Sequence, residues 1–270
     1  MKIVSFNINS IRARPHQIEH LRDTIDPDII GLQETKVNDP DFPIEMINEI
    51  GYHAEYWGQK GHYGVAILSK VKPLNTVKGF IDDSEEDQKR FIQSTHKLGS
   101  QEIVIMNGYF PQGENINHET KFPKKVKFYD DLEKHISKVK KHSKNLIVMG
   151  DFNVSPEDID IGIGEQNAKR WLRDGKTSFQ PQEREMWNKI KDLGFVDTWR
   201  VINQNESSIY SWFDYRSRMF DQDPKRGLRI DHILLSENLK STINKVGIDY
   251  QARAMEKPSD HCPIWLEINE

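Results

Sequence analysis

The sequence contains a single cysteine, Cys262, among its 270 residues. One cysteine excludes an intrachain disulfide bond and any cysteine-rich zinc site. Cys262 lies between His261 and Pro263, a position that favours packing over nucleophilic chemistry. Any catalytic or metal-binding function must therefore rest on oxygen and imidazole groups.

The sequence also lacks an apolar signal segment and any hydrophobic run long enough to span a bilayer. The first residues, Met1 to Phe6, instead begin at once with the pattern of a strand. These absences predict a cytoplasmic protein that makes no membrane contact. Because no segment suggests oligomerisation, a monomer is the default expectation.

Excess positive charge is missing as well, since the formal net charge is −4 at pH 7. No global basic field therefore favours nucleic-acid binding, although the local placement of Lys and Arg decides affinity. A hydrophobic content of 36% suffices for a core, and a charged content of 30% is typical of a soluble protein. With no linker, repeat or low-complexity block, residues 1–270 are expected to form a single domain.

The segment from Asn145 to Asn153 is the clearest structural signal. Its short apolar run, rich in β-branched residues, predicts a buried strand. Gly150 then permits a turn or a close approach of two backbones. If the chain stays extended, Asp151 and Asn153 project from one face at the end of the strand. A polar turn is the alternative reading of these two residues.

Further strands alternate irregularly with helices along the chain. Strands are expected near residues 2–8, 28–34, 52–56, 64–69, 90–97, 102–109, 208–216, 229–235 and 263–268. Helices are expected from about Pro15 to 22 and over 42–50, 121–144 and 187–193, with a helical turn at 237–239. This order predicts an α/β fold with two packed, mainly antiparallel β-sheets flanked by helices.

Polar side chains follow many of these apolar runs. A carboxylate at the end of a buried strand is costly unless it is paired, hydrogen-bonded or metal-bound. Four acidic residues in such positions make a shared cleft more probable than coincidence, although sequence spacing is not distance in space. The set is Asn7, Glu34, Tyr109, Asp151, Asn153, Asp231, Asp260 and His261.

The same runs resemble, in order, those of the exonuclease III family of abasic-site endonucleases, within the endonuclease/exonuclease/phosphatase superfamily that includes DNase I. The resemblance covers essentially the whole chain and implies a four-layer, DNase I-like α/β sandwich. Ser10 is a departure from the family pattern, in which Gly is expected at this position. The difference does not affect the proposed catalytic groups. The runs are Ser5–Asn9, Leu32–Lys36, Asn107–Pro111, Gly150–Asn153 and Ser259–His261, supported by Gly61–Ala66, Trp212–Arg216 and Arg226–Asp231.

The resemblance implies a divalent metal, with Mg²⁺ expected and Mn²⁺ a possible substitute. Glu34 is the strongest ligand candidate, because Mg²⁺ usually takes one or two carboxylates and keeps several waters. A surface Glu paired with Lys36 is its structural alternative. The sequence leaves open whether one or two ions bind. The candidate ligands are Asn7, Glu34, Asp151, Asn153, Asp260 and His261.

The resemblance also assigns catalytic roles. Asp151 would be the general base for the attacking water, or a second metal ligand. Asn153 would donate to the transition-state oxyanion, and Tyr109 would hydrogen-bond the phosphate. Asp231 would fix the tautomer of His261 and favour its protonated ring, which would then contact the phosphate. Each residue taken alone is also explained as a structural polar group.

The resemblance also assigns residues that would contact the substrate. The resemblance places Trp212, Leu228 and Ile230 around a small apolar pocket for an extruded abasic sugar, although all three also suit a core. Lys36 and Arg216 are expected to contact duplex phosphates. Further candidates for such contacts are Lys60, Lys121, Lys124, Lys125 and Arg218, each of which alone is more often a solvated charge.

These assignments predict a Mg²⁺-dependent DNA repair nuclease acting on double-stranded DNA. It would cut 5′ to abasic sites and remove nucleotides or blocking groups from 3′ termini, by in-line attack of water. A phosphoesterase of the same superfamily, acting on inositol phosphates or sphingolipid headgroups, would use the same catalytic set. A DNA-binding module with a degenerate site is the non-enzymatic alternative.

Overall fold

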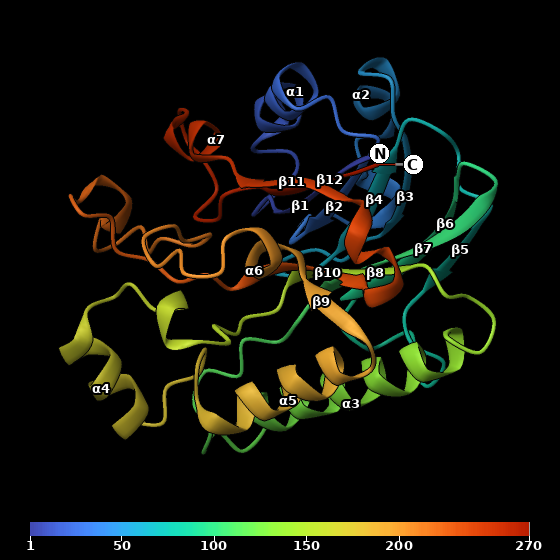
Figure 1. Cartoon of the computed structure of the whole chain (residues 1–270). Helices are drawn as coiled ribbons and strands as arrows, with labels where there is room; N and C mark the ends of the chain where they lie inside the picture. Colours follow the sequence, from blue (N-terminus) through green and yellow to red (C-terminus); the bar gives the residue numbers. More distant parts are fainter. Residues whose placement is uncertain (270) are drawn as a thin grey trace.

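The computed structural model describes residues 1–269 and places two six-stranded sheets face to face, with helices on both outer sides (Figure 1). The first sheet has the strand order β11-β12-β1-β2-β4-β3. Its strands are β1 (Lys2–Asn7), β2 (Ile29–Gln33), β3 (His53–Trp57), β4 (Val65–Ser69), β11 (Ile243–Ile248) and β12 (Ile264–Ile268).

The second sheet has the order β5-β6-β7-β8-β10-β9. Each sheet contains one parallel pair, β1 with β2 and β7 with β8, and the other pairings are antiparallel. The strands are β5 (Asn75–Lys78), β6 (Phe91–Leu98), β7 (Gln101–Tyr109), β8 (Leu146–Asp151), β9 (Phe195–Asp197) and β10 (Asp231–Ser236).

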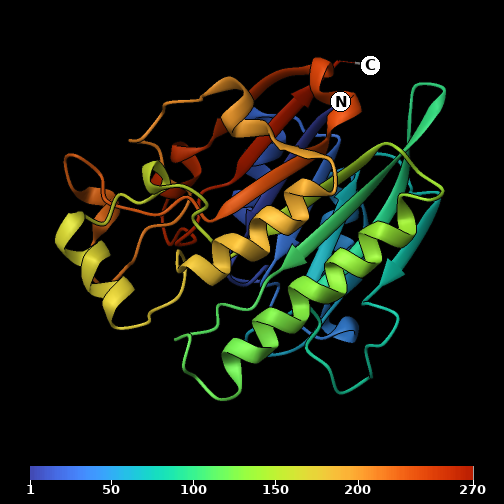
Figure 2. The ribbon, with the colours of Figure 1, turned by 60° about the horizontal axis from the view of Figure 1, so that its bottom comes forward.

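Helices cover the outer face of each sheet. Figure 2 shows α3 and α5 running side by side over the second sheet. Among the described residues, no helix is both long and apolar enough to cross a bilayer. The helices are α1 (Pro15–Thr24), α2 (Ile44–Glu49), α3 (Lys121–Val139), α4 (Glu165–Arg173), α5 (Pro181–Asp192), α6 (Thr198–Ile202) and α7 (Tyr250–Ala254).

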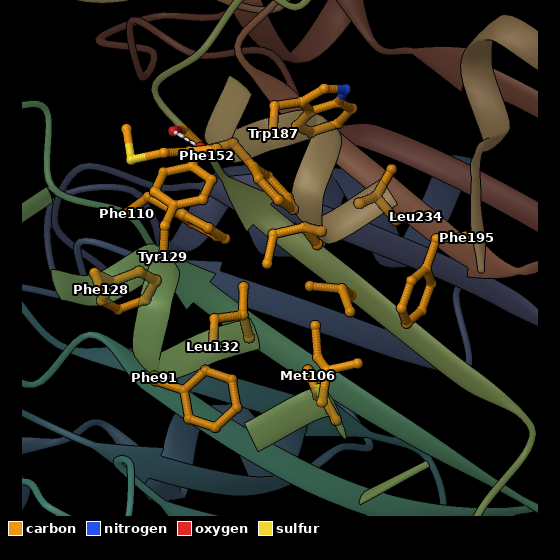
Figure 3. Close-up of a cluster of buried hydrophobic side chains, with 14 of the residues drawn as sticks. Phe91, Met106, Phe110, Phe128, Tyr129, Leu132, Phe152, Trp187, Phe195 and Leu234 are labelled. Atoms are coloured by element: carbon orange, nitrogen blue, oxygen red, sulfur yellow. Dashed lines mark hydrogen bonds between the residues drawn. The ribbon is translucent and has the colours of Figure 1, made fainter. Parts of the chain in front are cut away.

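Alternation along the strands divides the core into layers. In β7, Ile103 and Ile105 face the other sheet, whereas Val104 and Met106 face α3 and α5. Successive side chains of a strand point to opposite faces, so a strand buried on both sides must be apolar throughout. Figure 3 shows the aromatic layer under the helices, where Phe152 lies among Phe110, Tyr129 and Trp187. One buried cluster contains residues of both sheets, such as Ile3 of β1 and Ile105 of β7. The single domain over residues 1–270 stays a prediction.

The predicted fold class is confirmed, with local corrections. Residues 208–216 do not form a strand, since only isolated bridges at Trp212 link this segment to Leu228 and His261. The strands β5, β9 and β11 and the helices α4, α6 and α7 were not predicted. Helix α5 begins at Pro181, earlier than predicted, because Gln180 and Glu183 form a capping box at its start.

Candidate active site

The two sheets bring their polar strand ends to one edge of the sandwich. In the parallel pairs, Asn7 lies in register with Gln33, and Tyr109 with Asp151. Asp231 begins the antiparallel strand beside Asp151. A cavity of about 410 Å³ opens at this edge. Ten predicted residues line it, namely Glu34, Tyr109, Asp151, Asn153, Trp212, Arg216, Leu228, Ile230, Asp260 and His261.

Asn7 joins carboxylates from the two sheets. Its side-chain nitrogen donates to Glu34 Oε1 and to Asp151 Oδ2, each at 3.0 Å. Its side-chain oxygen accepts from the Asn9 backbone N–H at 3.2 Å. Asn7 is fully buried beneath the cavity, so it orients Glu34 and Asp151 from below.

The backbone turns sharply at the site. A Cβ on Gly150 would lie 1.9 Å from the carbonyl oxygen of Gly108, so only glycine allows this close approach. Glu34 and Asn153 have φ values of 52° and 53°, in the left-handed region. The extended geometry assumed for Asp151 and Asn153 therefore ends at the strand, and the turn itself brings both into the cavity. The backbone N–H of Asn153 donates to Asp151 Oδ1 at 3.0 Å.

Asp231 and His261 form the predicted carboxylate–imidazole couple. His261 Nδ1 lies 2.9 Å from Asp231 Oδ2, and Nε2 lies 3.7 Å from Asp151 Oδ2. Burial alone would lower the pKa of His261, but the Asp231 and Asp151 carboxylates outweigh burial and raise it. The ring is therefore a buried imidazolium that donates to Asp231.

Burial has the opposite effect on the acids of the site. It raises the pKa of Asp151, and the nearby Asp231 and Glu34 carboxylates add to the increase against the opposing His261. Burial and Glu34 also raise the pKa of the Tyr109 phenol well above its ordinary value. Asp151 is thus suited to accept a proton near neutral pH, and Tyr109 is suited to donate a hydrogen bond.

Asp260 is held by two donors. Asn9 donates to its Oδ1 at 2.9 Å, and the Trp212 indole N–H donates to its Oδ2 at 3.1 Å. Burial would raise its pKa, but the adjacent His261 and these donors lower it. This arrangement favours a role in anchoring Trp212 over the predicted metal-ligand role.

The apolar side of the cavity contains the predicted sugar-pocket residues. Leu228 and Ile230 are 1% and 3% exposed and pack with Ile163 and Phe179, whereas Trp212 is only partly buried against them. Leu228 and Ile230 therefore belong to a buried cluster and also line the cavity. The wall is rigid because it belongs to a buried cluster.

The predicted phosphate contacts have different environments. Lys36 is half-buried, with its ammonium 2.9 Å from Glu34 Oε2 and 2.6 Å from Asn9 Oδ1. Arg216 is exposed at the cavity. The interpretation of Lys125 as a surface phosphate contact is wrong, because its side chain is fully buried in an ion pair with Glu183.

Sequence reasoning missed part of the cavity wall. Gln112 directly follows a motif that was recognised, and Asp214 lies inside another, so both carried a sequence signal. Of the others, Trp171 lies on α4, Lys176 and Ser178 follow α4, and Met219 begins a short 3₁₀ helix. None of these positions follows the end of a strand. The missed residues are Gln112, Trp171, Lys176, Ser178, Asp214 and Met219.

The donor set of the site fits a hard divalent cation. The carboxylates of Glu34, Asp151 and Asp260 line the cavity, and Asp231 lies behind His261. The Lys36 ammonium contacts Glu34, the His261 ring lies between Asp151 and Asp231, and Lys176 and Arg216 also line the cavity. The ligand atoms of Asp151, Asp231 and His261 lie within 4.8 Å of one another, but a protonated ring cannot bind a metal. Glu34 and Asp151, linked by Asn7, are the better pair for Mg²⁺ or Mn²⁺.

A sandwich of two mixed sheets with an acidic, histidine-containing site at one edge defines a class of phosphodiester hydrolases. The model of the Endonuclease/Exonuclease/phosphatase family matches residues 4–261. The chain belongs to this family.

Within this family, the chain is similar to several nucleases and a phosphatase. The chain is 52% identical to exodeoxyribonuclease III of Haemophilus influenzae over 268 residues, covering 99% of this chain and 100% of the relative. A Neisseria 3′ phosphatase, NExo, solved with a product DNA hairpin, aligns with a TM-score of 0.91 at 32% identity. An AP endonuclease from Archaeoglobus fulgidus aligns with a TM-score of 0.88 at 34% identity. Both structural alignments cover 100% of each chain.

These similarities confirm the predicted family, the DNase I-like fold and the predicted class of function, a DNA repair nuclease. They also argue against the non-enzymatic alternative, because the relatives are nucleases and a phosphatase.

Proposed function

We propose that the chain hydrolyses double-stranded DNA 5′ to abasic sites and removes nucleotides and phosphates from 3′ termini, with Mg²⁺ as its metal. The observation that carries this proposal is the meeting of Glu34, Asp151 and His261 in one cavity beside an apolar pocket. The identity to an exodeoxyribonuclease over almost the whole chain favours DNA over a small phosphoester. The cytoplasmic location and the monomeric state stay predictions from the sequence.

Each residue of the site has a role in hydrolysis. Asp151 takes a proton from the attacking water, since its raised pKa suits a general base. His261, held by Asp231 through Nδ1, directs its Nε2–H toward a phosphoryl oxygen. Tyr109 and the side-chain amide of Asn153 donate to the phosphate as charge develops on its oxygens. The P–O3′ bond breaks, leaving a 3′-hydroxyl and a 5′-phosphate.

Glu34, oriented by Asn7, would hold the metal, and a second ligand role for Asp151 is the alternative to its role as the base. When bound, a divalent ion supplies Lewis-acid polarisation of the phosphate and partial neutralisation of its charge. The adjacent carboxylate oxygens of Glu34 and Asp151, oriented by one buried amide, support this assignment.

We expect chelation to abolish cleavage. A duplex carrying one abasic analogue is incubated with the protein in Mg²⁺, in EDTA, and in EDTA followed by excess Mg²⁺ or Mn²⁺, and the products are read on a sequencing gel. Cleavage should appear on the 5′ side of the analogue in Mg²⁺, stop in EDTA and return with either ion. Undiminished cutting in EDTA would disprove the metal dependence.

The apolar pocket predicts a substrate-specific effect of Trp212. Extruding a nucleotide costs a few kcal/mol, and least where the base is missing, so the pocket selects the bare sugar. We expect Trp212→Ala to slow abasic cutting by roughly 10- to 150-fold, corresponding to about 1.5–3 kcal/mol of lost apolar burial, with a smaller effect on 3′-phosphate removal. Trp212→Phe is the matched control, because it keeps an aromatic ring at the pocket but lacks the indole N–H that donates to Asp260. Equal losses on the two substrates would count against the pocket.

A further inference from the structure

The buried ion pair of Lys125 and Glu183 links the two helices behind the active site. Lys125 lies on α3 and Glu183 on α5, and both side chains are 0% exposed. Taking two charges out of water is costly, and a pair of apolar residues would often serve a helix contact as well or better. A buried pair at this position therefore calls for an explanation beyond packing.

The Lys125 ammonium reaches three acceptors. It donates to Glu183 Oε1, to the Asn153 carbonyl oxygen at 2.9 Å and to the Gln112 carbonyl oxygen at 3.4 Å. Tyr129, one turn later on α3, donates from its hydroxyl to the Phe152 carbonyl oxygen at 3.0 Å. Helix α3 thus holds two consecutive carbonyl groups of the turn that follows Asp151.

Glu183 extends the contact to a third loop. Its Oε2 accepts the backbone N–H groups of Ser178 and Gln180, both at 2.8 Å. The Ser178 carbonyl oxygen in turn accepts the Ser155 N–H at 2.6 Å. Gln112, Asn153 and Ser178 all line the active-site cavity, and each belongs to a different loop. The ion pair therefore contacts the backbone of three loops that line the cavity.

Asn153 is the residue most dependent on this support. Its φ of 53° lies in a region that non-glycine residues adopt at a cost, and such a conformation persists when its surroundings fix it. Its side-chain amide donates to the Phe110 carbonyl oxygen at 3.0 Å, so backbone and side chain are both constrained. The backbone contacts come from Asp151 on one side and Lys125 on the other.

We propose that Lys125 and Glu183 are positioning residues that hold Asn153 and the adjacent cavity walls in the geometry required for phosphodiester hydrolysis. This inference rests on the proposed function, and it assigns the pair a share in the rate of the chemical step as well as in stability. Neither residue contacts the substrate.

Two variants separate positioning from stability. Lys125→Met leaves the Glu183 carboxylate buried without its partner, so both stability and rate should fall. Lys125→Met/Glu183→Gln removes that uncompensated charge and keeps an acceptor for Ser178 and Gln180, but it lacks the ammonium that holds Asn153. Lys134→Met, at a position on the same helix where the side chain is 75% exposed, is the matched control.

The measurements are thermal melting, single-turnover cleavage of a saturating abasic duplex in Mg²⁺ below the melting range, and duplex binding in EDTA by fluorescence anisotropy. We expect Lys125→Met to lower the melting temperature and to slow cleavage by roughly 10- to 100-fold, the cost of a small displacement of a catalytic group. The double variant should recover melting temperature and stay slow. Duplex binding should match the unmodified protein throughout, and Lys134→Met should behave as the unmodified protein in every assay.

Cleavage that recovers together with stability in the double variant would overturn the inference, as would normal single-turnover cleavage by Lys125→Met. Either result would leave the proposed function intact, because the unmodified protein would still cut the duplex. A failure of the unmodified protein to cut it would overturn the proposed function, and this inference with it.

Discussion

Asp151→Asn is expected to slow DNA cleavage by roughly 10²–10⁴-fold, the usual contribution of a general base. The amide retains the size of the carboxylate and can still accept from Asn7, so the fold of the site should persist. DNA affinity should change little, because the proposed phosphate donors remain in place. Burial already raises the pKa of Asp151, so loss of this charge should not destabilise the protein.

Single-turnover rates at saturating DNA measure this effect, and anisotropy in EDTA measures binding. Asp158→Asn provides the control, since it makes the same chemical change at a side chain that is 91% exposed. Raising the Mg²⁺ concentration distinguishes the two roles left open for Asp151. A rate restored by excess Mg²⁺ would indicate a metal ligand, and a rate that stays low would indicate the base. Near-normal cleavage at ordinary Mg²⁺ would remove Asp151 from both roles.

The sequence alone predicted which strand ends carry the site, because apolar runs that end in acids are easily recognised. Asp151 and Glu34 lie at such ends, and both meet in the cavity. The turns that follow were not predictable from periodicity. Glu34 and Asn153 leave the extended conformation at once, and their left-handed φ values depend on contacts from other segments.

The sequence pattern mainly failed to predict edge strands and irregular loops. In β11 the polar Asn244 and Lys245 interrupt the apolar pattern, because this edge strand is partly open to solvent. The segment around Trp212 has apolar residues at strand-like spacing, yet it is a loop that packs Phe213 and Trp212 into two different clusters. Local pattern cannot distinguish a strand from a loop whose side chains are buried by tertiary contacts.

The burial of Lys125 is likewise decided by tertiary contacts and could not be predicted from local pattern. Its neighbours Lys121, Lys124 and Lys127 are exposed on α3, whereas Lys125 lies four residues before Tyr129 on the buried face of the helix. Helical spacing thus indicates the face, but a lysine is seldom fully buried without a partner. Its partner Glu183 lies 58 residues away on another helix. Burial of a charge is decided by that distant partner, so it required the structure.

A second buried network is centred on Arg229, which lies between Leu228 and Ile230, two residues of the apolar cavity wall. Its guanidinium donates to Asp160 Oδ1 at 2.6 Å, to Asp197 Oδ2 at 2.8 Å and to His232 Nδ1 at 2.9 Å. Burial and Arg229 lower the pKa of His232 to about 4, so the ring is neutral and its Nε2–H donates to the Val154 carbonyl oxygen. Arg229 therefore holds the segment that leads into β10 in place.

Arg229→Met is expected to destabilise the protein by about 3–5 kcal/mol, because it leaves buried carboxylates without their partner. For a domain of this size, that loss corresponds to a decrease in melting temperature of roughly 10 °C. Arg173→Met is the control, since it breaks an ion pair whose arginine side chain is 74% exposed and should cost less than about 1 kcal/mol. Urea unfolding followed by circular dichroism measures both variants.

The deficit of Arg229→Met should also depend on pH. Burial would raise the pKa of Asp160, but Arg229 and Arg200 outweigh burial and lower it. A lowered folded-state pKa contributes stability that is present above the unfolded value of about 4 and is lost as pH falls through the folded value. Without Arg229, the Asp160 carboxylate is costly when charged and tolerated when protonated. The difference in unfolding free energy between variant and unmodified protein should therefore be largest near pH 7. It should shrink as the pH falls, from the raised pKa of Asp160 in the folded variant down to its lowered pKa in the unmodified protein. A deficit that stays constant across this range would show that the ion pair is not its source.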